Sequence, residues 1–96
     1  MKLLMVIYSG ERPQLVTSLL EKHQVRGYTE LTNAHGTGAT GRRADTRAWP
    51  GGSAVFFTVI EAALADELVS ALEAAAGTLP AGERLHAAVM PVERFF

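Results

Sequence analysis

The segment between residues 34 and 53 carries the side chains of this chain that are best suited to binding an anion. It contains five glycines and three arginines, Arg42, Arg43 and Arg47. Guanidinium groups are permanently charged and donate paired hydrogen bonds to phosphate or carboxylate, and glycine frees the backbone to wrap such a ligand. These residues predict a site for a small anion. The alternative is that the arginines only keep a surface loop solvated.

The glycine-rich run at residues 36–41 begins with Gly36, Thr37 and Gly38. It matches neither the phosphate-binding loop of nucleoside triphosphatases nor the dinucleotide fingerprint, because no Lys-Ser/Thr pair follows it and no helix starts directly after it. A hinge and a ligand cradle are both compatible with this composition. Trp49, which precedes Pro50, is a candidate anchor for a partner protein, and the alternative is burial against the body of the domain.

Three histidines, His23, His35 and His86, are candidate metal ligands, since neutral imidazole is a common ligand. Their spacing matches no metal motif. His35, beside Gly36, is the candidate for contact with an ion or ligand. His23 is expected to interact with the final carbonyls of a helix, and His86 to face solvent or an interface.

Residues with nucleophile–base spacing are not evident, and the chain has no cysteine. No catalytic residue is therefore assigned, and the chain is predicted not to be an enzyme. A small ferredoxin-like enzyme remains an alternative. Arg12 lies where an acylphosphatase would carry its arginine, but the glycine-rich phosphate loop is missing around it.

The composition limits the classes of partner. The 96 residues carry a formal net charge of −1, which gives no general attraction to nucleic acid or to an anionic membrane. The apolar start at residues 3–7 is too short for a signal or membrane segment. We expect a cytoplasmic protein without direct membrane insertion, and the absence of cysteine is compatible with that compartment.

The elements that must position these residues follow from apolar periodicity. Strand-like runs and helical spacing alternate along the chain, with strands at 2–8, 28–32, 54–60 and 85–92 and helices after Pro13 and at 64–76. Two strand–helix–strand units predict an α+β, ferredoxin-like βαββαβ fold, with a four-stranded antiparallel sheet and both helices on one face. The other face needs a cover, because Phe56, Phe57, Phe95, Phe96 and the N-terminal run are all apolar. A second copy of the chain is the best candidate for it.

Four segments, taken in order, resemble the PII signalling protein superfamily. They are the strand at 2–8, Gly27-Tyr28-Thr29, which is similar to a Gly-Met-Thr motif, Gly36-Thr37-Gly38, and the run Val-Met-Pro-Val-Glu at 89–93. Trp49-Pro50-Gly51 resembles the shorter PII-like branch of the nitrogen regulatory protein P-II family.

This resemblance implies one domain over 1–96 and a homotrimer with small effectors in the clefts between subunits. Residues at about 36–52 would form the flexible T-loop that docks on a target protein, such as an enzyme or a membrane transporter. Thr29 would lie near an adenine base, and Gly36 and Gly38 would line the phosphates of ATP, ADP or AMP. Thr37, Arg42, Arg43 and Arg47 would complete the ligand site, and Arg42, Arg43 and Trp49 would contact the partner.

The last loop departs from the family pattern. Classical members carry Gly-Asp-Gly-Lys there, whereas this chain has Glu83-Arg84-Leu85-His86, and the T-loop tyrosine and the arginines after the last strand have no counterpart. The classical phosphate cradle is therefore absent, so either Arg84 replaces it or the ligand differs. Another alternative is a metal-responsive PII-like protein linked to metal efflux, with His35 as a ligand.

Overall fold

The computed structural model describes residues 1–38, 41–43 and 53–96. Along the chain, the elements are β1 (Lys2–Ser9), α1 (Gln14–Lys22), β2 (Thr29–Ala34), β3 (Gly36–Gly38), β4 (Gly41–Arg43), β5 (Ser53–Ile60), α2 (Ala62–Ala76) and β6 (Arg84–Pro91). The strands and helices predicted from periodicity are confirmed, with boundaries that move by one or two residues.

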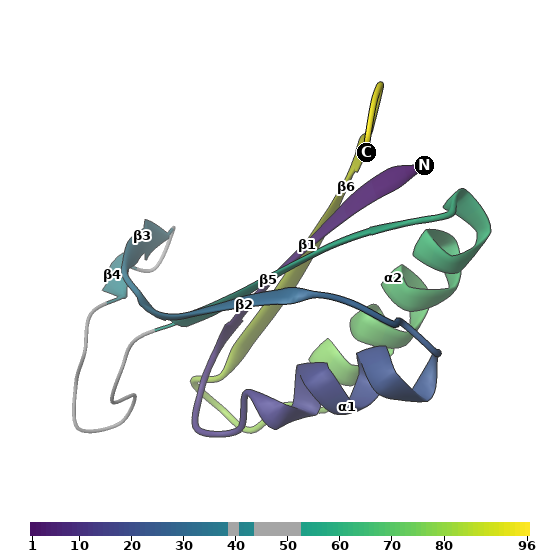
Figure 1. Ribbon diagram of the computed structural model, residues 1–96. Coiled ribbons are helices and arrows are strands. Elements are labelled where there is room, and N and C mark those ends of the chain that lie inside the picture. The colour runs from purple at the N-terminus through teal and green to yellow at the C-terminus, as the bar shows by residue number, and fades with distance from the viewer. Residues whose placement is uncertain (39–40, 44–52) are drawn as a thin grey trace.

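Four of the strands form one antiparallel sheet in the order β2-β5-β1-β6. β1 lies at a central position in this sheet. It can be apolar throughout because a strand flanked on both sides has no free edge. Both helices cover the same face of the sheet (Figure 1). The α+β, ferredoxin-like fold expected from the sequence is thus confirmed.

The core lies between the sheet and the two helices. Alternate residues of β1 point toward the helices, because successive side chains of a strand face opposite ways. The largest fully buried side chains are Tyr8, Phe56, Leu4, Leu20, Leu68, Leu72, Val6 and Val16. They come from β1, β5 and both helices, so the core joins the two halves of the sequence.

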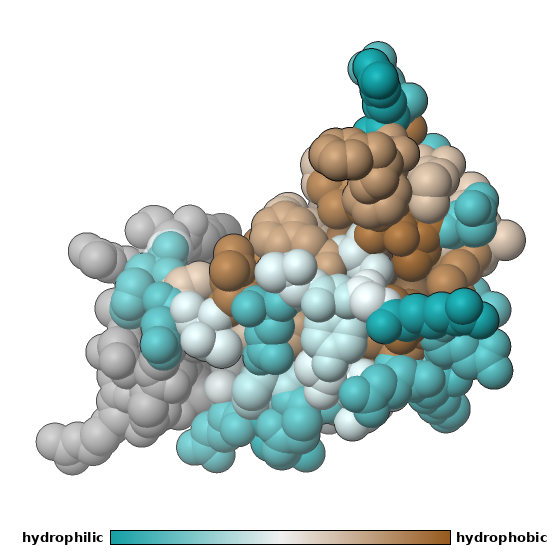
Figure 2. Space-filling model, in the orientation of Figure 1, coloured by the Kyte–Doolittle hydropathy of each residue, from teal (hydrophilic) through white to brown (hydrophobic). Residues whose placement is uncertain are grey.

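The opposite face of the sheet carries a second apolar surface. Strand register places the residues of this bare face in rows, which contain Leu3, Met5, Ile7, Leu31, Val55, Phe57, Val59, Ala88 and Met90. Leu31 and Met90 are exposed. The expectation for Phe56 was wrong, because it alternates with Phe57 and points into the core beneath the helices. Figure 2 shows brown hydrophobic atoms gathered below a hydrophilic tip at the top of the view, and teal atoms along the lower side, where α1 lies.

The described part of the segment predicted as the T-loop over 36–52 contains two short strands. Gly36, Thr37 and Gly38 pair in antiparallel register with Arg43, Arg42 and Gly41, so β3 and β4 form a separate two-stranded hairpin. This pairing satisfies backbone hydrogen-bonding groups that a loop would leave to solvent. Just before the hairpin, the register of β2 shifts between Leu31 and Ala34, and Asn33 has a φ of 59°.

A polar contact of His23 joins the two helices. Its partner is not the one predicted for His23. The Nδ1 atom of His23 pairs with Oε2 of Glu67 on α2, instead of with the last carbonyls of α1. The backbone N–H of His23 donates to the carbonyl of Leu19 and already closes the helix end. The ring is therefore left to contact the neighbouring helix.

Among the helices of the described ranges, none has the length and apolar character needed to cross a bilayer.

Candidate functional site

One end of the sheet gathers several of the predicted anion-binding residues. Ala34, Ser53, Ser9 and Arg84 occupy corresponding positions on four neighbouring strands. Ser9 and Ser53 are buried, and their Oγ atoms are 2.5 Å apart. Because β3 begins two residues after Ala34, the hairpin leaves the body at this end, which we call the hairpin end. Arg84 and the glycines Gly36 and Gly38 thus belong to the same end of the sheet.

The hairpin brings glycines and arginines together. In the ladder, Arg42 lies opposite Thr37 and Arg43 opposite Gly36. The backbone positions of two arginines therefore lie opposite a threonine and a glycine. Gly36 has open space on the side where a Cβ would lie. Arg47 and Trp49 fall outside the described residues, so their predicted roles stay predictions.

The other end of β2 borders a shallow hollow. Its volume is about 270 Å³, and the backbone that enters β2 meets the end of β5 there, with Gly27, Thr58, Val59, Ile60 and Glu61 among the lining residues. Thr58 holds this edge in place, because its Oγ1 donates a 2.7 Å hydrogen bond to the Gly27 carbonyl. Thr29, predicted to lie near an adenine base, begins β2 directly after this edge.

The two candidate regions are separate within one chain. Thr29 begins β2, whereas Gly36 begins β3, two residues after β2 ends at Ala34. Figure 1 shows the β3-β4 hairpin at one end of β2, and the last turn of α1 near the other end. The hollow is lined by backbone and by side chains that include Arg26 and Glu61.

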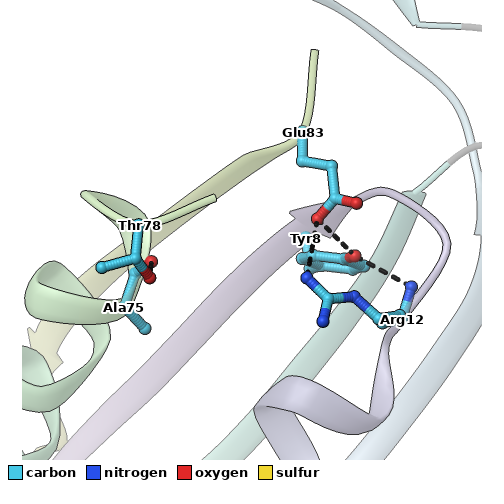
Figure 3. Close-up of polar contacts among 5 residues, drawn as sticks. All are labelled: Tyr8, Arg12, Ala75, Thr78 and Glu83. Atoms are coloured by element: carbon cyan, nitrogen blue, oxygen red, sulfur yellow. Dashed lines mark hydrogen bonds and ion pairs between the residues drawn. The ribbon is translucent and has the colours of Figure 1, made fainter. Parts of the chain in front are cut away.

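A polar cluster at the hairpin end was missed by the sequence analysis. The Tyr8 hydroxyl donates to Oε1 of Glu83 at 3.0 Å and accepts a 2.9 Å hydrogen bond from the backbone N–H of Arg12. The Nη2 atom of Arg12 lies 3.9 Å from the same Glu83 oxygen (Figure 3). Burial of the hydroxyl is the main cause that raises the pKa of Tyr8 above 10.0, although the Arg12 hydrogen bond lowers it. No local motif announces this cluster, because Tyr8 and Glu83 are 75 residues apart.

The predicted metal role of His35 has no support within the described ranges. Those residues contain no group of three or more metal-ligating His, Asp or Glu side chains. His35 and His86 are both exposed. The exposure of His86 agrees with the expectation that it faces solvent or an interface.

Comparison with known proteins decides the family. The model of the family described as Nitrogen regulatory protein P-II matches residues 1–94. The chain belongs to the P-II family. The resemblance seen in its motifs is thereby confirmed, and the chain is placed among PII-like regulatory proteins.

Solved structures agree on the fold. CPII, a nitrogen regulatory PII-like protein from Thiomonas intermedia K12 solved bound to ADP, AMP and bicarbonate, superposes with a TM-score of 0.73 at 20% identity. The alignment covers 97% of this chain and 88% of CPII. A PII-like signalling protein from Thermus thermophilus gives a TM-score of 0.62 at 16% identity, over 93% of this chain and 84% of that protein. No curated protein matches the chain.

Proposed function

We propose that this P-II family member is a sensor that binds a small anionic effector between identical subunits and regulates a partner protein. The single observation that carries the proposal is the family match over residues 1–94. CPII, which shares the fold, was solved with ADP, AMP and bicarbonate, so an adenine nucleotide or bicarbonate is the effector class to test first. The chain then acts by binding, with no catalytic residue.

The separation of the two candidate regions supports a cleft between subunits. The hollow near Gly27 supplies backbone, apolar surface and the Arg26 and Glu61 side chains for a nucleoside, whereas the hairpin end would supply Arg42, Arg43 and Arg84 for phosphates or bicarbonate. The volume of the hollow, about 270 Å³, falls below the roughly 300–1,000 Å³ usual for small-molecule sites. In our proposal, the hairpin end of a neighbouring subunit completes the hollow, and one effector touches both.

The bare face supports the oligomer that such a cleft requires. A contiguous apolar sheet face on a small domain normally packs against another surface. The family resemblance implies three subunits, and we propose a homotrimer in which these faces meet.

The segment at 36–52 is proposed as the T-loop of a domain that spans 1–96. An effector held by Gly36, Gly38 and the hairpin arginines would bias the conformation of this segment through its base. Arg42, Arg43 and Trp49 would then offer charged and aromatic contacts to a target protein, such as an enzyme or a membrane transporter, in the cytoplasm. Arg47 would add a further charge to the ligand or the partner.

Calorimetric titration tests this function. The wild-type oligomer is titrated with ADP, AMP, ATP, cyclic AMP and bicarbonate, and we expect at least one of them to bind with one site per subunit. Replacing Arg42 and Arg43 together by alanine should weaken that binding about tenfold or more, since charge-assisted contacts to the anion are lost. Light scattering should give the same oligomer for both proteins. Silence toward every effector would contradict the proposal.

A further inference from the structure

Glu83 is a buried carboxylate that links two loops far apart in sequence. Its side chain is only 5% exposed, and its Oε1 atom accepts the Tyr8 hydroxyl and faces the Arg12 guanidinium. A buried charge without partners is costly, and removal of one partner is strongly destabilising. The contacts therefore hold the loop between β1 and α1 against the turn that leads into β6.

Backbone and side-chain contacts constrain the turn that carries Glu83. The backbone N–H of Glu83 donates to the Pro80 carbonyl at 3.1 Å, and Gly82 has a φ of 90°. A Cβ added at Gly10 would lie 2.3 Å from the Tyr8 hydroxyl oxygen and 2.9 Å from Glu83 Cδ, so the two loops are in close contact. At the end of α2, the Thr78 hydroxyl donates to the Ala75 carbonyl at 2.9 Å (Figure 3).

Arg84 follows Glu83 directly and is the first residue of β6. Strand register places Arg84 opposite Ser9, in the same row as Ser53 and Ala34 at the hairpin end. The position at which β6 starts therefore decides where the Arg84 guanidinium can reach. The Glu83 side chain adds to the pairing of β6 with β1 in fixing that start to the rest of the fold.

We propose that Glu83 is a positioning residue for anion binding. By anchoring the start of β6 to Tyr8 and Arg12, it holds Arg84 toward the phosphate or bicarbonate group of the effector at the hairpin end. This inference rests on the proposed function and adds a specific dependence to it. The affinity for the anion depends on Glu83 although its own carboxylate repels anions, and the dependence passes through Arg84.

A double-mutant cycle tests this route, with ADP, AMP and bicarbonate as probes. Binding is measured by calorimetry for the wild-type protein, Glu83→Ala, Arg84→Ala and the double variant. We expect Glu83→Ala to weaken binding about tenfold in the wild-type background and to have almost no further effect once Arg84 is alanine. Glu83→Gln, which keeps an acceptor for Tyr8, should recover most of the affinity and guards against misfolding of the alanine variant. Glu21→Ala, which removes an exposed carboxylate of α1, is the matched control.

The outcomes separate the two proposals. Binding by the wild-type protein with an equal loss in both backgrounds, or with no loss in Glu83→Ala, would overturn the positioning role and leave the sensor intact. Weaker binding by Glu21→Ala to the same extent would also overturn it, because the loss would then not be specific to Glu83. A wild-type protein that binds none of the probes would overturn the proposed function and this inference with it.

Discussion

At the scale of single residues, Tyr8 shows how one hydroxyl joins the core to two loops at the hairpin end. Its ring is 1% exposed among the core residues, while its oxygen contacts Arg12 and Glu83 at the hairpin end. The sequence correctly predicts Tyr8 at the end of a buried strand. It does not predict the partners, because they depend on the long-range meeting of two turns.

Tyr8 should make stability depend on pH in the alkaline range. Its pKa is raised by burial, so the folded protein holds this proton more tightly than the unfolded chain. The corresponding stability is fully present below pH 10 and is lost as the pH rises through the folded pKa. Denaturant unfolding of wild type and Tyr8→Phe between pH 8 and pH 11.5 (roughly the range that brackets this titration) should show a smaller alkaline loss in the variant.

The control for this titration is Tyr28→Phe, which removes the chain's other tyrosine hydroxyl and leaves Tyr8 in place. It should lose stability at high pH as the wild-type protein does. An alkaline loss that is the same in Tyr8→Phe as in wild type would show that Tyr8 does not control it.

Gly10 should tolerate no side chain. A methyl group there would overlap the Tyr8 hydroxyl and approach Glu83, and both are part of a packed cluster. We expect Gly10→Ala to lower the free energy of unfolding by about 1–3 kcal/mol, measured by urea denaturation. Gly27→Ala, with open space around its Cβ, is the matched control and should change it far less. Equal effects of the two substitutions would contradict the geometry of the cluster.

At the scale of elements, β2 matters most because its two ends carry different halves of the candidate site. Apolar periodicity predicted β1, β5 and both helices well, since their patterns follow burial on one or two faces. The glycine-rich run has no such periodicity, so the pairing of β3 with β4 could not be read from it. The bulge before the hairpin was also invisible, because Asn33 adopts a positive φ without glycine.

The contact between His23 and Glu67 should contribute little to stability. His23 pairs with Glu67, whose side chain is 57% exposed, and exposed ion pairs are worth at most about 1 kcal/mol. We expect His23→Ala to lower the free energy of unfolding by no more than about 1 kcal/mol in urea denaturation. A much larger loss would show that the contact organises the helix pair.

At the scale of the whole molecule, the bare face is the feature that connects fold to proposed assembly. The sequence predicted this face from the ferredoxin-like order of elements, and the register confirms its rows. Phe57 and Met5 lie opposite each other within it. The number of subunits could not be predicted from these residues, because an apolar face indicates only that another surface covers it.

A charge at the middle of the bare face should break the oligomer. Phe57→Glu places a carboxylate in the proposed interface, where its desolvation opposes association. We expect monomers by light scattering with the helical content unchanged in circular dichroism. Ala74→Glu adds the same charge on the exposed side of α2 and should leave the oligomer intact. An oligomer that survives Phe57→Glu would show that another surface joins the subunits.

The central claim is that one effector touches the hollow of one subunit and the hairpin end of its neighbour. Mixed oligomers test it most directly, with Gly27→Leu to fill the hollow in one set of subunits and Arg42→Ala with Arg43→Ala to weaken the hairpin in the other. Each variant alone should bind the effector poorly, whereas randomly mixed oligomers should regain about a quarter of the wild-type sites in calorimetry, because some boundaries then pair two intact halves. Mixed oligomers that bind no better than either parent would contradict the claim.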